Sequence, residues 1–216
     1  VLCDADILML SVPPEYGGMS QGLLFCCIAI EELCKVCASS GMILMIQSLS
    51  TIPIELAGNE EQKKRILPKM ATGEWLGAFA VTEPQAGSDA GALRTRAVRK
   101  GDKYILNGTK RFITNADNAQ VMTSFALTDP EKGARGISAF IIEKGFPGLS
   151  IGKHENKMGI RGSTTCEVIF EDCEVPAANL LANEGDGFKI AMMTLDRSRP
   201  GVGAQAVGIA QGAIDY

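Results

Sequence analysis

The first third of the chain carries a pattern of apolar positions that predicts three helices. Residues 21–38 are apolar on nearly all sides in their first half, which indicates a helix inside a bundle. A second helix is expected over residues 42–57, where Pro53 predicts a kink. Asn59 is a good N-cap for a third helix over residues 60–70, because its side chain can accept a hydrogen bond from the first turn.

Beyond Trp75 the helical period gives way to short runs of β-branched and aromatic residues. Such runs, separated by Gly, Pro, Asn and Asp, predict an antiparallel barrel or sandwich. The dipeptide Asn107-Gly108 is a strong signal for a tight hairpin turn. The expected strands are residues 78–83, 94–99, 104–107, 110–114, 121–127, 137–143 and the neighbourhood of 168–170.

A long helix is predicted again at the end of the chain, over residues 188–216. Small residues recur through it, including Gly201, Gly208 and Gly212. Glycine weakens an isolated helix, so these positions are expected to serve close approach to another helix. The helix therefore needs partners, and we expect some of them beyond Tyr216.

The stretch 78–91, AFAVTEPQAGSDAG, joins the helical part to the strand-rich part. Because Pro84 cannot donate to a sheet, the first strand is expected to end near Glu83. The turn that follows contains Gly87 and Ser88, and its small side chains leave main-chain N–H groups open to an anion. The sequence therefore predicts a binding loop at this boundary.

Composition restricts the class of protein. The 216 residues are 46% hydrophobic and 21% charged, with a net charge of −4, and no basic run indicates nucleic acid. Residues 36–54 carry no charge, but their serines, Gln47 and Pro53 favour a buried helix over a membrane span. The cysteines number seven, and four of them cluster in an apolar helical stretch, which favours a reducing compartment over a disulfide framework.

Common cofactor and metal motifs do not occur in the sequence. There is no G-x-G-x-x-G after a strand, no G-x-x-x-x-G-K-[ST] and no H-E-x-x-H. Cys34 and Cys37 have no second ligand pair, so they are expected to be small core residues. His154, the one histidine, lies in a polar run without an evident orienting partner, so we expect it at the surface. No metal site is predicted.

Four stretches together carry a family resemblance. In chain order they are TEPQAGSDAG from Thr82, NGTKRFITNA from Asn107, IRGSTTCEVIFEDCEVP from Ile160 and GDGFKIAMMTLDRSRPGVGAQAVGIAQ from Gly185. At this spacing, on a helix–sheet–helix pattern, they resemble the acyl-CoA dehydrogenase family, and its short-chain (butyryl-CoA) branch most closely. The resemblance begins at Pro13 and covers almost the whole chain.

The resemblance implies an α+β fold with a partial N-terminal helical bundle (1–74), a middle antiparallel β-barrel (75–183) and the start of a C-terminal helical bundle (184–216). It also implies FAD-dependent dehydrogenation of short- to medium-chain acyl-CoA thioesters to trans-2-enoyl-CoA. Most members carry the catalytic Glu well beyond the position of Tyr216, so no catalytic base is expected in this chain. Relatives of the isovaleryl and long-chain types place it near Ser198, and the serine there argues against those branches.

Site residues follow from the matching motifs. Val81 and Thr82 are expected at the pyrimidine end of the flavin, Gly87 at the pyrophosphate, and the Thr114 hydroxyl at N5 or O4. Phe112 stands where many relatives have Trp, so an aromatic is retained but the indole N–H is lost. The full expected set is Phe79, Val81, Thr82, Gly87, Ser88, Phe112, Ile113 and Thr114 for the cofactor, and Ser88, Asp196, Arg197, Ser198 and Arg199 for acyl-CoA.

The resemblance also implies partners. An electron-transfer flavoprotein is the expected electron acceptor, the subunits are expected to form a homotetramer, and neither nucleic acid nor membrane insertion is expected. Bacterial cytoplasm and mitochondrial matrix are both compatible with the composition. Two alternatives remain open: an acyl-CoA oxidase that passes electrons to O2, and a non-catalytic fragment of such a flavoprotein.

Overall fold

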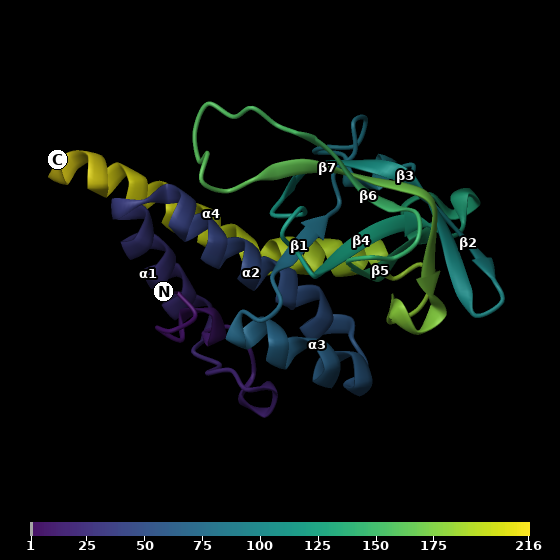
Figure 1. The fold of residues 1–216 in the computed structure, drawn as a ribbon, viewed down its shortest axis with the longest axis horizontal. Coiled ribbons are helices and arrows are strands. Elements are labelled where there is room, and N and C mark those ends of the chain that lie inside the picture. Colours follow the sequence, from purple (N-terminus) through teal and green to yellow (C-terminus); the bar gives the residue numbers. More distant parts are fainter. Residues whose placement is uncertain (1) are drawn as a thin grey trace.

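Helices form the two ends of the chain and a sheet forms its middle (Figure 1). A computed structural model describes residues 2–216, and Val1 lies outside this part. The N-terminal helices are α1 (Gly22–Val36), α2 (Ala38–Ala57) and α3 (Glu60–Thr72), and the last element is α4 (Gly187–Asp215). All four predicted helices are confirmed. The predicted break after α1 lies earlier than expected, because Cys37 is extended and separates α1 from α2.

The third helix is bounded as the sequence predicts. The Asn59 side chain accepts a hydrogen bond from the Gln62 amide, and the Gln62 side chain accepts one from the Asn59 amide, each at 2.9 Å. This reciprocal arrangement satisfies two amides that have no partner inside the helix. At the other end, Gly73 adopts the left-handed conformation with φ of 76°. The helix bounded in this way packs in the apolar cluster that joins the helices to the sheet.

The middle of the chain forms one eight-stranded sheet in the order β6-β7-β3-β2-β4-β5-β8, with β1 paired to β4. Most pairs are antiparallel, as predicted, while β1 and β2 each run parallel to β4. The expected strands at 121–127 and 137–143 are confirmed at the same limits. The strands are β1 (Gly77–Ala80), β2 (Arg96–Lys100), β3 (Lys103–Thr114), β4 (Val121–Leu127), β5 (Ile137–Glu143), β6 (Leu149–His154), β7 (Thr165–Pro176) and β8 (Leu180–Leu181).

The hairpin predicted at Asn107-Gly108 is wrong. Both residues lie inside the single long strand β3, which pairs with β7 on either side of a bulge between Leu106 and Gly108. Gly108 has φ of 152°, and a Cβ there would collide with the backbone and side chain of Thr95. The glycine therefore serves a bulge and a close approach rather than a turn. The hairpin between β2 and β3 lies at Gly101 instead.

Two apolar clusters hold the layers together. One joins α2, α3 and the start of α4 to the sheet, and Phe79 of β1 packs edge-on to Phe125 in it, with ring centroids 5.3 Å apart. The other lies among the strands, where Tyr104 and Phe140 make the corresponding contact at 4.9 Å. The sheet is thus apolar on both faces, and this explains the nearly continuous burial of β4 and β5.

Within residues 2–216, α2 is the one helix long and apolar enough to cross a membrane by length and composition. Half of its apolar window is buried inside the protein. The Gln47 side chain at its centre donates to the carbonyls of Met70 and Trp75 and accepts from the Gly77 amide. A polar residue bonded in this way ties α2 to the end of α3 and the start of β1, which is the role of a core helix.

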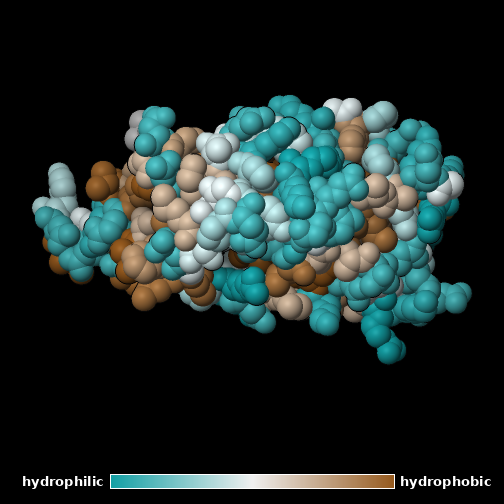
Figure 2. Space-filling model, turned by 90° about the horizontal axis from the view of Figure 1, so that it is seen from below, coloured by the Kyte–Doolittle hydropathy of each residue, from teal (hydrophilic) through white to brown (hydrophobic). Residues whose placement is uncertain are grey.

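The last helix runs from the sheet past α2 and along α1, where it ends beyond the other helices (Figure 1). Gly208 and Gly212 lie so close to the main-chain carbonyls of Glu31 and Lys35 that a Cβ would overlap them. The predicted close approach of helices is therefore confirmed. Apolar residues gather on the surface of this helical end, whereas the sheet end is mainly hydrophilic (Figure 2). They include Leu24, Phe25 and Val36 of α1 and Val207 and Ile214 of α4.

Candidate functional site

The predicted binding loop begins where β1 ends. β1 stops at Ala80, and Glu83 and Ala86 then exchange two main-chain hydrogen bonds that close a tight turn around Pro84. Gly87 and Ser88 follow on the exposed side of this turn, and a Cβ on Gly87 would meet no atom within 4 Å. Their amides donate to no group in the described part of the chain. Free amides in an open turn suit a negatively charged ligand.

A bulge in β3 sets the second group of predicted residues. The register of β3 with β7 shifts between Lys110 and Ile113, and Phe112 in this interval has φ of 57°, which is unusual for a bulky residue. Phe112 is 56% exposed. Thr114, two residues on, is half-buried. The bulge thus turns an aromatic ring outward beside a threonine at the end of the strand.

A hydrogen bond joins this bulge to the binding loop. The Arg111 amide donates to the Thr82 carbonyl at 2.8 Å, so the end of β3 and the segment after β1 lie side by side. The hydroxyls of Thr82 and Thr114 have no protein partner among residues 2–216. The exposed ring and the two unpaired hydroxyls therefore belong to segments that this hydrogen bond joins, and the two free amides follow in the turn after Thr82. These residues fit a planar aromatic cofactor that carries a phosphate group.

Two predicted cofactor residues point elsewhere. The Phe79 side chain is packed against Phe125, and Ile113 is buried among the strands. Their side chains serve the core, so only their main-chain atoms are available to a ligand. A motif match carries over consecutive residues together, whereas successive side chains of a strand point to opposite faces. The match alone therefore does not tell core side chains from those that face a ligand.

Beneath the loop lies a buried ion pair that was not among the predicted site residues. Lys110 Nζ is 2.7 Å from Glu83 Oε1, and the two side chains are 0% and 2% exposed. Lys110 also donates to the Val81 carbonyl, and Glu83 accepts from the amides of Arg94 and Thr95. One ion pair therefore joins β1, β3 and the start of β2. The signal that could have found it is a charged residue in each of two motifs, Glu83 in TEPQAGSDAG and Lys110 in NGTKRFITNA.

The two charges stabilise each other against burial. Burial opposes ionisation of Glu83, but the Lys110 ammonium and the hydrogen bonds from Lys110, Thr95 and the Arg94 amide outweigh it and lower the pKa of this carboxyl. Burial lowers the pKa of Lys110 to about 8 against the opposing effect of Glu83. Neither residue is therefore a free acid or base, and their role is to hold the loop.

The predicted substrate segment lies on α4. Asp196 and Arg199 are exposed and form an ion pair at 2.9 Å, one turn apart. Arg197 is also exposed, and the Ser198 hydroxyl donates to the Leu195 carbonyl. Leu195 packs in the same apolar cluster as Val81. The structure thus brings the α4 segment and the binding loop to one cluster.

A cavity of about 340 Å³ opens beside this segment, between α1, α2 and α4. It is mainly apolar and is bordered by Arg197 and Ser198 on one side and Glu55 on the other. Burial raises the pKa of Glu55 above its ordinary value, and its Oε1 has no partner in the described residues. The other lining residues are Ser11, Pro13, Ser20, Gly22, Leu23, Cys26, Ile30, Met45, Ser48, Leu49, Ile52 and Gly201.

Two family models match the chain in succession. The N-terminal domain of acyl-CoA dehydrogenase matches residues 1–74, and the middle domain of acyl-CoA dehydrogenase matches residues 78–173. The chain belongs to the acyl-CoA dehydrogenase family. The two matches meet at the segment where the helices give way to the sheet, and the second one contains the binding loop and the β3 bulge.

Individual relatives agree with this assignment. Acryloyl-CoA reductase (NADH) of Anaerotignum propionicum is 55% identical over 216 residues, covering 99% of this chain and 55% of its own. Butyryl-CoA dehydrogenase from Megasphaera elsdenii superposes with a TM-score of 0.96 at 45% identity, covering 99% and 57%. A structure from work on the electron transferring flavoprotein of Acidaminococcus fermentans superposes at 0.97 with 52% identity, also covering 99% and 57%. The chain spans about half the length of these relatives.

Proposed function

We propose that the protein is the N-terminal part of an FAD-dependent acyl-CoA dehydrogenase that converts short- to medium-chain acyl-CoA thioesters to trans-2-enoyl-CoA. The observation that carries the proposal is the exposed Phe112 ring at the β3 bulge, beside the unpaired hydroxyls of Thr82 and Thr114. FAD, when bound, supplies the acceptor for the β-hydride. Membership of the family supports the same cofactor and reaction class.

In this proposal the residues of the chain bind and orient. Phe112 would flank the flavin, and the Thr82 and Thr114 hydroxyls would donate hydrogen bonds to it. The free amides of Gly87 and Ser88 would bind the pyrophosphate. The catalytic carboxylate is supplied from outside residues 2–216, so the chain alone positions the cofactor and substrate but does not remove the α-proton.

The acyl group is proposed to enter the cavity between α1, α2 and α4, with Arg197, Ser198 and Arg199 near the CoA moiety. The mainly apolar lining supports an alkyl chain, and a cavity of this size suits a short chain. An electron-transfer flavoprotein as electron acceptor and a homotetramer are part of the same proposal. The similarity to the Acidaminococcus fermentans structure supports the first of these partners.

The reaction is tested by mixing the complete, FAD-loaded protein with butyryl-CoA without oxygen. We expect the visible absorbance of the flavin to bleach, because the acyl group reduces it. Palmitoyl-CoA serves as the long-chain comparison. A flavin that keeps its colour with butyryl-CoA contradicts the proposed reaction, and rapid peroxide formation in air would favour an oxidase instead.

A second direction of the same reaction is favoured by one observation. The 55% identical relative is named for the reduction of acryloyl-CoA. The same residues would orient FAD and the thioester in either direction. Dithionite-reduced protein mixed with acryloyl-CoA tests this, and reoxidation of the flavin faster than butyryl-CoA reduces it would favour the reductase.

Thr114→Val is expected to weaken FAD binding by roughly five- to tenfold, because one hydrogen bond to the cofactor is lost while the shape of the side chain is kept. Titration of the apoprotein with FAD, followed by flavin fluorescence, measures the change. Thr109→Val on the same strand is the matched control and should bind FAD as the wild type does. Equal affinity of Thr114→Val and wild type would remove Thr114 from the proposed site.

Gly201→Val is expected to shorten the accepted acyl chain. A side chain at Gly201 enters the cavity and meets Ile30 and Met45, whose nearest atoms would lie 3.3 and 3.7 Å from its Cβ. The kcat/KM ratio of octanoyl-CoA to butyryl-CoA measures the effect and should fall at least tenfold. Gly203→Val, where a Cβ meets nothing within 4 Å, is the control. An unchanged ratio would place the acyl chain elsewhere.

A further inference from the structure

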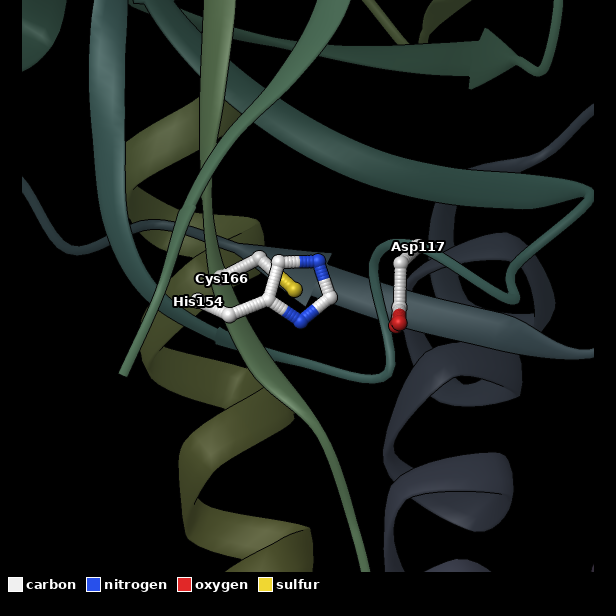
Figure 3. A group of neighbouring side chains, drawn as sticks. All are labelled: Asp117, His154 and Cys166. Carbon is white, nitrogen blue, oxygen red and sulfur yellow. The ribbon is translucent and has the colours of Figure 1, made fainter. Parts of the chain in front are cut away.

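Three side chains of metal-binding type lie close together near the end of the β6–β7 ladder (Figure 3). They are Asp117 from the turn after β3, His154 at the end of β6 and Cys166 near the start of β7. One ligand atom from each lies within 4.8 Å of the other two. The three residues are far apart in sequence, which is why the spacing of motifs predicted no site there.

We propose that Asp117, His154 and Cys166 form a binding site for a zinc-type divalent cation that fastens the edge strand β6 to β7. Thiolate, imidazole and carboxylate are the ligands that zinc uses in proteins. Calcium and magnesium prefer oxygen ligands alone, so the thiol and imidazole argue against them. A water molecule completes the four-coordinate shell.

The backbone brings the ligands together. His154 and Cys166 are direct cross-strand partners in the β6–β7 ladder, so their side chains emerge side by side. Ligand atoms in a tetrahedral zinc shell lie about 3.3–3.6 Å apart, from the usual bond lengths. The three ligand atoms lie within 4.8 Å of one another, and the exposed His154 side chain has room to approach the other two. Cys166 is fully buried and fixes one ligand in place.

The carboxylate is already oriented. Thr164 Oγ1 donates to Asp117 Oδ1 at 2.5 Å, and Asn118 Nδ2 donates to the same oxygen at 3.0 Å. Oδ2 accepts neither of these two bonds. Partners of this kind hold a metal ligand in its binding orientation. A polar surface cavity of about 220 Å³ adjoins the site, and it is lined by His154, Thr164 and Thr165 among others.

Charge at the site suits a divalent ion. Binding of M²⁺ releases the Cys166 thiol proton to solvent and forms an M–S bond. The metal with one thiolate and one carboxylate has no net charge. The neighbouring ammonium groups, Lys144 on the Asp117 carbonyl and Lys157 on the Ser163 carbonyl, therefore oppose binding only weakly.

The site lies at the base of the long connection between β6 and β7, at one end of the strand order. This connection reaches back to the helices, where the Gly162 amide donates to Ser39 Oγ at 3.2 Å. Cys166 is the cross-strand partner of Ile113, so the two side chains lie on the same face of the sheet. Phe112 does not share this face. A metal here would stabilise this connection without entering the proposed flavin site.

Cobalt titration of the purified, FAD-loaded protein under reducing conditions tests the site. Co²⁺ in a four-coordinate site gives intense d–d bands at wavelengths beyond those at which flavin absorbs. We expect one Co²⁺ per chain, displacement by Zn²⁺, and a rise in the melting temperature on the order of 5 °C at saturating Zn²⁺. No such bands in the wild type would overturn the proposal.

Variants assign the ligands. Cys166→Ser and His154→Ala are expected to lose the bands, and Thr164→Val to bind roughly tenfold more weakly. Cys173→Ser, on the same strand and equally buried, is the control and should titrate as the wild type does. His154 is exposed, so its variant tests the site even if the serine variant does not fold. Bands that survive in His154→Ala, or that disappear equally in Cys173→Ser, would assign the metal to other cysteines.

Discussion

Replacing Lys110 with methionine is expected to lower the free energy of unfolding by about 3–5 kcal/mol, because it leaves the Glu83 carboxylate buried without its partner. The amides of Arg94 and Thr95 continue to donate to Glu83, but they do not neutralise its charge. Urea unfolding, followed by circular dichroism, measures the loss. FAD binding should weaken with it, because Lys110 also donates to the Val81 carbonyl beside the proposed flavin.

The same strand offers a matched control. Lys103 forms a pair with Glu174 at 2.6 Å, similar in length, but the two side chains are 38% and 44% exposed. Lys103→Met should therefore cost at most about 1 kcal/mol. The double variant Lys110→Met, Glu83→Gln removes both charges and should recover most of the loss. Equal costs at Lys110 and Lys103 would show that burial of the first pair has no energetic consequence.

Acid should act through the same pair. The pKa of Glu83 is lower in the folded protein than its ordinary value of 4.5. Its contribution to stability is therefore present above about pH 4.5 and is lost as the pH falls through the folded value. Part of this acid sensitivity should disappear in the double variant. An identical pH dependence of unfolding in both proteins would contradict this assignment.

Gly187→Ala is the second change with a large expected effect. Gly187 begins α4, and a Cβ there would lie 2.5 Å from the Ser138 carbonyl carbon and 2.8 Å from the Ala139 amide nitrogen. Because these are main-chain atoms of β5, α4 has to shift to make room. We expect a loss of about 1–3 kcal/mol in unfolding free energy, and a rise in KM for acyl-CoA because α4 carries Asp196–Arg199.

Gly203→Ala provides the comparison for this helix. Gly203 lies inside α4, and a Cβ there meets no atom within 4 Å. Alanine should be neutral or stabilise the helix by up to about 1 kcal/mol. We measure urea unfolding and acyl-CoA kinetics for both variants. The comparison separates the effect of the steric contact with β5 from the effect of the higher helix propensity of alanine. If Gly187→Ala behaves like Gly203→Ala, α4 is not docked on β5 through this glycine.

The predictions that succeeded depended on residues close together in the sequence. The cap at Asn59 depends on residues within one turn, and β4 and β5 are mainly apolar runs with turn residues around them. Such signals are contained in a short window of sequence. The Asn107-Gly108 hairpin failed for the complementary reason: the glycine is needed because Thr95 approaches it from another strand, and a local pattern does not distinguish that from a turn.

Some features of the candidate site are likewise visible in the sequence, and others appear only in the tertiary structure. Its motifs are visible in the sequence, and with the resemblance they indicate the family, the binding loop and the α4 segment. The sequence by itself thus determined which residues are present and where the helices and most of the strands lie. Only the tertiary structure decided that Phe112 faces outward while Ile113 is buried, because a bulge sets that orientation. It also decided that Lys110 meets Glu83 and that His154 meets Cys166 and Asp117, since strand register places side chains together whatever their separation along the chain.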